Sequence, residues 1–175
     1  SQVMRRLVRV TLIGLVGLVA LGLWLNQGNP PKTKPVSEVV EGACVSAGNT
    51  VVIDYGKTSS LPVEVNCVKG FSGSSWNLLK TVGSVTGTQK YPVGFVCRIN
   101  NFPGEAQDQC IDTPGLTSGS WAFFIATKDS WEYSAFGAAT HKVKCGTAEG
   151  WRFLAKDENL NTPPRVKPTV INCEK

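Results

Sequence analysis

The most apolar run of the chain beyond residue 28 is Ser120-Trp121-Ala122-Phe123-Phe124-Ile125-Ala126. Successive side chains of a strand point to opposite faces of a sheet, so this run places its large apolar groups on both faces. One face carries Trp121, Phe123 and Ile125, and Phe124 lies on the other. A turn at 128–130 and the returning run Trp131-Glu132-Tyr133-Ser134 predict a β-hairpin. This aromatic hairpin indicates a β-rich domain.

Further strand patterns flank the hairpin on both sides. Runs that are β-branched or alternate between apolar and polar residues predict strands at 50–55, 61–68, 93–99 and 150–154. We also expect an edge strand over 141–145, whose lysines protect the exposed edge, and a short strand over 169–171. The 18 glycines and 10 prolines fit a domain with many turns.

One segment changes from the strand period to the helix period. Within residues 74–82, Trp76, Leu79 and Val82 recur at helical spacing and are expected to face the core. Ser74 or Ser75 is the expected N-cap, and Gly83 follows the last turn. We therefore predict one short helix beside the strands, which makes the fold class α+β.

The net charge of +5 is concentrated at the N-terminus. Arg5, Arg6 and Arg9 precede an apolar block, and without these three arginines 15 basic residues face 13 acidic ones. No run of lysine or arginine interleaves with aromatic residues, so the sequence does not favour a nucleic-acid partner. We expect a solvated surface of mixed charge.

The apolar block at residues 10–25 predicts a single N-terminal transmembrane helix. It is interrupted only by Thr11 and three glycines, and with Leu7 and Val8 the helix reaches roughly 28 Å, about one hydrocarbon core. The alternative is a cleaved signal peptide, for which residues 25–29 offer a poor cleavage site. The basic N-terminus stays in the cytoplasm, so the bulk of the chain lies outside.

These observations divide the chain into three parts. Residues 1–28 form a signal-anchor helix in contact with membrane lipid, and residues 29–42 form a linker whose prolines make it extended and stiff. Residues 43–175 form the extracytoplasmic domain. We expect a single-pass protein of the cell membrane.

All six cysteines follow the apolar block: Cys44, Cys67, Cys97, Cys110, Cys145 and Cys173. No Cys-x-x-Cys occurs and His141 is the only histidine, so a zinc site is not favoured. An even number of cysteines outside the membrane indicates three disulfides. Six cysteines allow 15 pairings, among which we expect the nearest-neighbour set. A catalytic thiol would need a histidine partner.

The order of motifs resembles the transcobalamin C-terminal-like domains of bacterial exported proteins, in the disulfide-bearing actinobacterial form. The matching series starts with a valine-rich strand carrying Asp54 and a cysteine strand. It continues with the helix ending Leu78-Leu79-Lys80-x-Val82-Gly83, the run at 94–100, Trp131-Glu132-Tyr133-Ser134-x-x-Gly137-Ala138 and the run at 150–153. The turn after Ile99 reads Asn100-Asn101 where the family often has glycine. Cys145 and Cys173 look like an addition.

The resemblance implies a small β-grasp-like fold and a non-catalytic role in holding a small molecule or a protein partner. In the animal carriers the related domain closes over a cobamide. Bacterial members are membrane-bound or secreted. We expect a binding module that presents or captures a small molecule outside the cell, near a transporter. The alternative is an accessory subunit that docks onto a larger membrane protein complex and stabilises it.

Aromatic residues are the candidate ligand-binding groups. Trp121, Phe124, Trp131 and Tyr133 offer large rigid contact area, with Tyr133 and Phe124 as the better exposed candidates. The competing interpretation is that aromatic residues on strand faces, including Phe123 and Trp151, simply form the core. We expect no catalytic residue, no metal and no cofactor, because Asp54 and Asp112 are not brought together by any pattern and no nucleophile elbow occurs. His141 is expected at the surface.

Overall fold

The computed structural model describes residues 2–9, 13, 36–113 and 118–173. The chain divides into two units, Ser1–Pro35 and Val36–Lys175. In the first unit residues 2–9 are helical, and the predicted membrane segment lies outside the described residues except for Ile13. Within the described ranges, no helix combines the length and apolar character needed to cross a bilayer.

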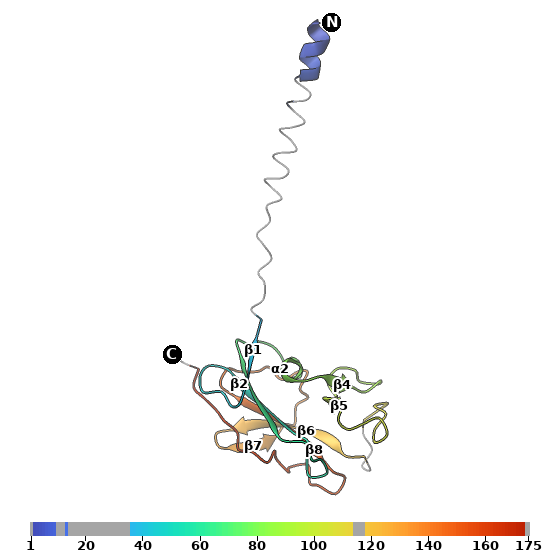
Figure 1. Ribbon diagram of the computed structural model, residues 1–175, viewed down its shortest axis with the longest axis vertical. Coiled ribbons are helices and arrows are strands. Elements are labelled where there is room, and N and C mark those ends of the chain that lie inside the picture. Colours follow the sequence, from blue (N-terminus) through green and yellow to red (C-terminus); the bar gives the residue numbers. More distant parts are fainter. Residues whose placement is uncertain (1, 10–12, 14–35, 114–117, 174–175) are drawn as a thin grey trace. The chain divides into compact units, whose positions relative to one another are not determined.

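The second unit is built on a six-stranded mixed sheet (Figure 1), with strand order β1-β3-β2-β8-β6-β7. Its strands are β1 (Glu38–Glu41), β2 (Asn49–Asp54), β3 (Glu64–Lys69), β6 (Ser120–Thr127), β7 (Ser130–Tyr133) and β8 (Ala148–Leu154). Only the central pair, β2 and β8, is parallel. Every residue of these two strands is buried, because both faces of the sheet centre are covered.

The helix α2 (Ser75–Val82) covers one face of this sheet. Ser74 is its N-cap, and the hydroxyl of Ser74 accepts a hydrogen bond from the amide of Asn77. Leu78 and Leu79 are fully buried and pack with Trp121, Phe123, Trp151 and other apolar residues of the main core. Trp76 is buried as expected, whereas Val82 is only partly buried and Leu78 takes its place. The predicted helix and its cap are confirmed.

A second, two-stranded sheet lies beside the main one (Figure 1). It consists of β4 (Val85–Gly87) and β5 (Val96–Ile99), which pair antiparallel. Val96 and Ile99 of β5 contribute to the main core. Therefore β5 forms a wall next to the large sheet.

The opposite face of the sheet is covered by the C-terminal segment, residues 155–173. Trp131 donates its indole N–H to the carbonyl of Val166 at 2.7 Å. A side chain at Gly150 would clash, since a Cβ there would lie 2.8 Å from Pro164 and 3.1 Å from Trp131. The absence of a side chain thus lets the C-terminal segment pack directly on β8.

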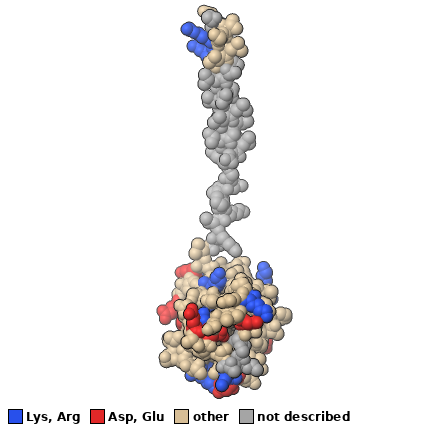
Figure 2. Space-filling model, turned by 90° about the vertical axis from the view of Figure 1, so that its right-hand side faces the viewer, with Lys and Arg blue, Asp and Glu red and all other residues tan. Residues whose placement is uncertain are grey.

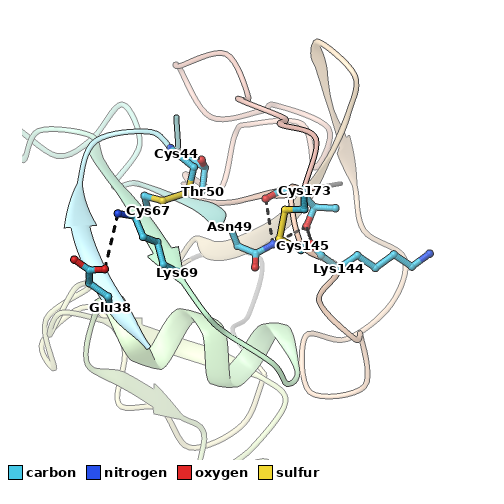
Figure 3. Close-up of a disulfide and its surroundings, with 10 residues drawn as sticks. Glu38, Cys44, Asn49, Thr50, Cys67, Lys69, Lys144, Cys145 and Cys173 are labelled. Carbon is cyan, nitrogen blue, oxygen red and sulfur yellow. Dashed lines mark hydrogen bonds and ion pairs between the residues drawn. A yellow bond between two sulfur atoms is a disulfide. The ribbon is translucent and has the colours of Figure 1, made fainter. Parts of the chain in front are cut away.

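The three disulfides join Cys44 to Cys67, Cys97 to Cys110 and Cys145 to Cys173, which confirms the nearest-neighbour pairing. Figure 3 shows the first and the last of them on either side of Asn49, whose amide donates to the carbonyl of Lys144 at 2.7 Å. Disulfides persist in oxidising compartments, so their number indicates an exported protein.

Several predicted strands and strand boundaries were wrong. Residues 141–145 and 169–171 are not strands; the former pairs only through an isolated bridge between Ser74 and Lys142. The strand expected over 93–99 begins at Val96. Strand β1 lies within residues 29–42, which were predicted to be linker; its pairing with β3 makes residues 38–41 part of the domain instead. Strand β4 had no counterpart in the prediction. The expected strands over 50–55, 61–68 and 150–154 and the hairpin are confirmed within a few residues.

Candidate functional site

A groove of about 200 Å³ opens where β5 and the segment after β7 approach the main sheet. Its floor is aromatic, and its sides are short loops. The residues that line it are Gly94, Phe95, Val96, Trp121, Phe123, Tyr133, Ser134, Ala135, Phe136, Gly137, Ala138 and Trp151. Adjacent strands β6 and β8 supply the floor because Phe123 and Trp151 are paired residues of the register.

The floor is rigid. The rings of Phe123 and Trp151 stack with centroids 4.8 Å apart and planes 20° from parallel. Trp121 packs edge-on against Phe153, and its indole N–H donates to the carbonyl of Phe102 at 3.1 Å. These contacts hold the aromatic groups in place before any ligand arrives, which reduces the entropy cost of binding.

One donor in this floor has no partner. The Nε1 atom of Trp151 is buried and makes no hydrogen bond to any part of the chain that the structure describes. The residue as a whole is 3% exposed. Buried N–H groups are nearly always paired in folded proteins, so this indole N–H is an exception among the described residues.

The rim of the groove is accessible. Phe136 is 71% exposed, and Tyr133 is also exposed. The turn that carries them is fixed by Ser134, whose hydroxyl donates to the carbonyl of Phe136 at 3.0 Å and accepts from its amide at 3.2 Å. The amide of Ser134 donates to the carbonyl of Phe123 at 2.8 Å. The turn is therefore tied directly to the floor.

The aromatic residues predicted to bind a ligand are divided between two faces of the sheet. Trp121 lines the groove. Tyr133 borders the groove, but it pairs with Phe124 in the register and its ring packs against Phe124, so the ring lies on the other face. Phe124 and Trp131 do not line the groove; they belong to the smaller core under the C-terminal segment. The expectation that Phe124 is exposed was wrong, because Phe124 is 1% exposed and its ring packs against Tyr133 at 5.8 Å.

Sequence reasoning missed Phe95 and Phe136 as parts of the groove. Phe136 lies outside strands, so no alternation pattern assigned it a face. Phe95 was expected within the strand over 93–99, which begins only at Val96. For Phe136 a weak signal existed, since a large aromatic residue in a turn next to glycine has no strand face in which to bury. Phe95 gave no such signal, because its position depends on how β5 packs against the sheet.

A second polar cluster lies at the N-terminus of α2. The Ser75 hydroxyl donates to Glu149 Oε1 at 2.6 Å and lies 2.8 Å from His141 Nδ1. When Glu149 is ionised, the hydroxyl donates its one proton to the carboxylate, so Nδ1 of His141 is the donor in the other contact. His141 is only partly exposed and not a free surface residue as expected. Burial, followed by the charge of Lys144, lowers the pKa of His141.

This cluster does not have the geometry of a nucleophilic relay. In such relays the serine and the acid contact different nitrogens of the imidazole ring. Here Ser75 and Glu149 both lie near Nδ1, the latter at 3.4 Å, and Ser75 is fully buried. The arrangement instead docks the helix onto the sheet, together with a backbone hydrogen bond from Ser75 to the carbonyl of His141.

Asp54 and Asp112 are not brought together. Asp54 is fully buried and receives hydrogen bonds from Arg165 and Arg152, whereas Asp112 is exposed and pairs with Lys90 at 3.0 Å. Burial alone would raise the pKa of Asp54, but the hydrogen bonds from Arg165 and Gly56 outweigh it and lower the pKa. Asp54 therefore carries a stable charge that holds the C-terminal segment.

Among the described residues, one group of acidic, cysteine or histidine side chains is close enough together to hold a metal ion. It consists of Cys97, Asp108 and Cys110. Both sulfurs of this cluster are engaged in a disulfide. A disulfide lacks the thiolates that bind metals, so the group forms no metal centre.

No family model matches the sequence, and neither a curated protein nor a solved structure matches it. Fold and site define the chain as a small, disulfide-bonded α+β domain of an exported protein, with an aromatic groove on the helix side of its sheet.

Proposed function

We propose that this chain is a membrane-tethered extracytoplasmic binding module that holds a small molecule in the aromatic groove. The observation that carries the proposal is the groove itself: an open rim with the exposed Phe136 beside a floor of Trp121, Phe123 and Trp151, of which Phe123 and Trp151 stack on each other. Ligand sites are typically concave and aromatic with a few polar groups, and this groove has that character.

The tether is part of the same proposal. The apolar block at residues 10–25 has the length of a bilayer span, and three arginines precede it. The three disulfides require an oxidising compartment, which agrees with a domain outside the membrane.

The strand order supports the proposed likeness to transcobalamin C-terminal-like domains. Without β1, the order is β3-β2-β8-β6-β7, so the first and last strands of the five lie side by side, parallel, at the centre. The single helix follows the first hairpin in the chain and covers one face. This is the arrangement of a β-grasp fold, which the resemblance implies.

The test uses the full-length protein, extracted from its native membrane in mild detergent and analysed by mass spectrometry for small molecules that remain bound. We compare it with Gly137→Leu, which places a side chain into open space at the groove. Gly104→Leu is the matched control, because a side chain there also meets nothing and Gly104 does not line the groove.

We expect a bound small molecule in the wild-type protein and in Gly104→Leu, and its loss in Gly137→Leu. Recovery of the same molecule from all three proteins would show that it does not bind in the groove. Recovery of none, also after incubation with an extract of the medium, would reject the binding module.

A second function has one observation in its favour. All four residues of β1 are exposed, including Val39 and Val40, and β1 pairs with β3 alone. An exposed apolar edge strand is a template for pairing with another chain. This favours an accessory subunit that docks onto a membrane protein complex.

The docking function is tested by placing a charge on the edge. Val40→Lys should abolish stoichiometric recovery of other subunits in the same extraction, and Val45→Lys, at a position that is also exposed, should not. A protein that comes out alone, with its small molecule, would reject docking as the function.

A further inference from the structure

The main sheet has an unpaired edge at β1. Within the described residues, β1 pairs with β3 and with no other strand. All four of its residues are exposed, Val39 to 42% and Val40 to 39%. Bulges, prolines and lysines commonly protect such an edge, but the register from Glu38 to Glu41 is continuous and β1 contains neither proline nor lysine. The edge of β1 therefore has the geometry to accept another strand.

The backbone groups that face this edge follow from the pairing with β3. The amide of Gly42 donates to the carbonyl of Val65 at 2.8 Å, so the backbone of Gly42 faces β3. Hydrogen-bonded and non-hydrogen-bonded residues alternate along an antiparallel pair, so Val40 also bonds β3. The N–H and C=O groups of Val39 and Glu41 consequently point away from β3. An extended segment that pairs with them adds a strand to the sheet.

The side chains of β1 carry negative charge at both ends of the strand. Glu38 and Glu41 flank the two valines, and alternation places one glutamate and one valine on each face of the sheet. Lys69 of β3 lies 3.8 Å from Glu38 (Figure 3), and because both side chains are exposed it offsets this charge only weakly. No described cation pairs with Glu41. The edge is therefore acidic.

This charge discriminates between occupants of the edge. A second copy of the chain would bring two more glutamates and one more lysine, which doubles the acidic charge at one short strand. An acidic segment is disfavoured in the same way, because like charges on paired strands are destabilising and opposite charges are favourable. A segment with basic residues opposite Glu38 and Glu41, and apolar residues opposite the valines, complements both the charge and the apolar surface.

We propose that β1 binds an extended segment of a partner protein in which basic residues flank two apolar residues. The segment adds a seventh strand to the six-stranded sheet: its backbone bonds Val39 and Glu41, and its basic side chains lie opposite Glu38 and Glu41. The inference rests on the second of the proposed functions, docking onto a membrane protein complex, and names the chemistry of the partner.

The probes are capped hexapeptides. The basic peptide is acetyl-Thr-Lys-Val-Val-Lys-Thr-amide, and the acidic peptide has glutamate in place of both lysines. Two further forms of the basic peptide each carry an N-methyl group on one valine amide. Full-length protein labelled with ¹⁵N, in an uncharged detergent, is titrated with each peptide. The resonances and the hydrogen exchange of the β1 amides report binding at the edge.

Two double variants test the role of the charges. Glu38→Lys with Glu41→Lys reverses the charge of the edge and removes only one weak, exposed ion pair from the fold. Asp129→Lys with Glu132→Lys is the matched control, because it makes the same change in net charge at exposed positions on or next to β7, at the opposite end of the sheet. A difference between the variants therefore reports where the charge lies.

We expect the basic peptide to bind at least tenfold more tightly than the acidic peptide, and to slow exchange of the Val39 and Glu41 amides. Reversal of the edge charge should reverse this preference, and the control variant should keep it. High salt should reduce the preference, because the charges are exposed. Methylation of one valine amide should abolish binding and methylation of the other should not, because alternate amides of a strand face its neighbour.

Equal affinity for the two peptides, or the same preference in both double variants, would overturn the basic partner. Equal effects of the two methylations would overturn strand addition. A full-length protein that sediments as a dimer, and as a monomer with Val40→Lys, would show that a second copy occupies the edge, against the proposal. If other subunits came out with the native protein and were lost in Val40→Lys, docking would stand and only the chemistry of the partner would fail.

Discussion

Glu149 is an acidic residue in an apolar core. It is fully buried on the face of β8 that α2 covers, Oε1 accepts the Ser75 hydroxyl, and Oε2 has no partner among the described residues. Burial raises the pKa of Glu149 to about 7, and the hydrogen bond from Ser75 offsets only part of this effect. Near neutral pH the carboxyl group is therefore close to its titration midpoint.

Stability should decline as the pH rises from 4.5 to about 7. In this range the unfolded chain has lost the Glu149 proton and the folded chain retains it, so rising pH favours unfolding, by about 3 kcal/mol in all. Glu149→Gln removes this titration and keeps the acceptor for Ser75. Urea unfolding of both proteins between pH 4.5 and 8 measures the effect.

His141 titrates beside Glu149. The lowered pKa of His141 acts in the opposite direction, since the folded state releases its proton first and gains stability as the pH rises toward 6.5. Because Nδ1 of His141 lies 3.4 Å from Glu149, the two titrations are coupled, and the difference between the proteins measures Glu149 together with this coupling. A difference that stays constant from pH 5 to 8 would contradict the buried titration.

At the scale of elements, the C-terminal segment depends on Asp54. The carboxylate accepts hydrogen bonds from Arg165 Nη2 at 2.6 Å and from the Arg165 amide at 2.8 Å, and Arg152 lies at 3.3 Å. Asp54→Asn should cost on the order of 3 kcal/mol, because it leaves buried Arg152 with less compensation. Denaturant unfolding and proteolysis of residues 155–173 measure the loss.

An exposed ion pair supplies the control. Asp157 pairs with Lys57 at 2.8 Å at the surface, so Asp157→Asn should leave the free energy of unfolding almost unchanged. The effect of Asp54→Asn should also fade in acid: the lowered pKa of Asp54 gives stability that is present above pH 3.8 and lost as the pH falls through the folded-state pKa. Equal effects of the two substitutions would contradict the special role of Asp54.

The three disulfides should differ in their resistance to reduction. Cys44, Cys67, Cys97 and Cys110 are buried, whereas Cys145 is exposed. We expect a water-soluble reductant to open the bond between Cys145 and Cys173 first, and mass mapping of alkylated cysteines follows the order. Opening of either buried disulfide ahead of it would show that access does not decide the rate.

The sequence predicts elements best where the pattern is local. The hairpin over 120–134 and the strand at 150–154 have strong apolar alternation, and the helix has a serine cap. All residues of β1 are exposed, and β4 has only three residues, so neither strand leaves an apolar alternation pattern in the sequence. The segment 141–145 alternates like a strand, but its backbone bonds the start of α2 instead, through Val143 to Gly73 and Ser75 to His141.

Only some of the residues that line the groove could be predicted from the sequence, because the others depend on contacts between distant segments. Trp121 and Tyr133 come from the hairpin, whose pattern is legible in the sequence. The choice between Trp121 and Phe124 as ligand contacts depends on which face of the sheet the C-terminal segment covers. That is decided by Arg165 and Asp54, which are far apart in sequence.

At the scale of the whole molecule, the surface of the domain is not specialised by charge on the face shown in Figure 2, where acidic and basic side chains are mixed. Recognition on this face would not rest on long-range attraction to one sign of charge. This agrees with a function based on the uncharged groove.

The two proposed functions make opposite predictions for the N-terminal segment. Replacing residues 1–28 by an unrelated single-span helix should leave small-molecule recovery unchanged if the chain is a binding module, because the groove lies wholly within residues 94–151. Recovery of bound molecule from isolated membranes measures this. If this replacement left the bound small molecule in place but abolished recovery of other membrane subunits with the protein, the accessory subunit would be favoured.

The parallel pairing of β2 with β8 has a consequence for biogenesis. Thr50 and Ala148 are neighbours at the centre of the sheet, so the valines of β2 stay uncovered on that side until β8 has emerged from the translocation channel. Contacts between such distant segments form slowly. The centre of the sheet therefore assembles only after most of the chain is available for folding.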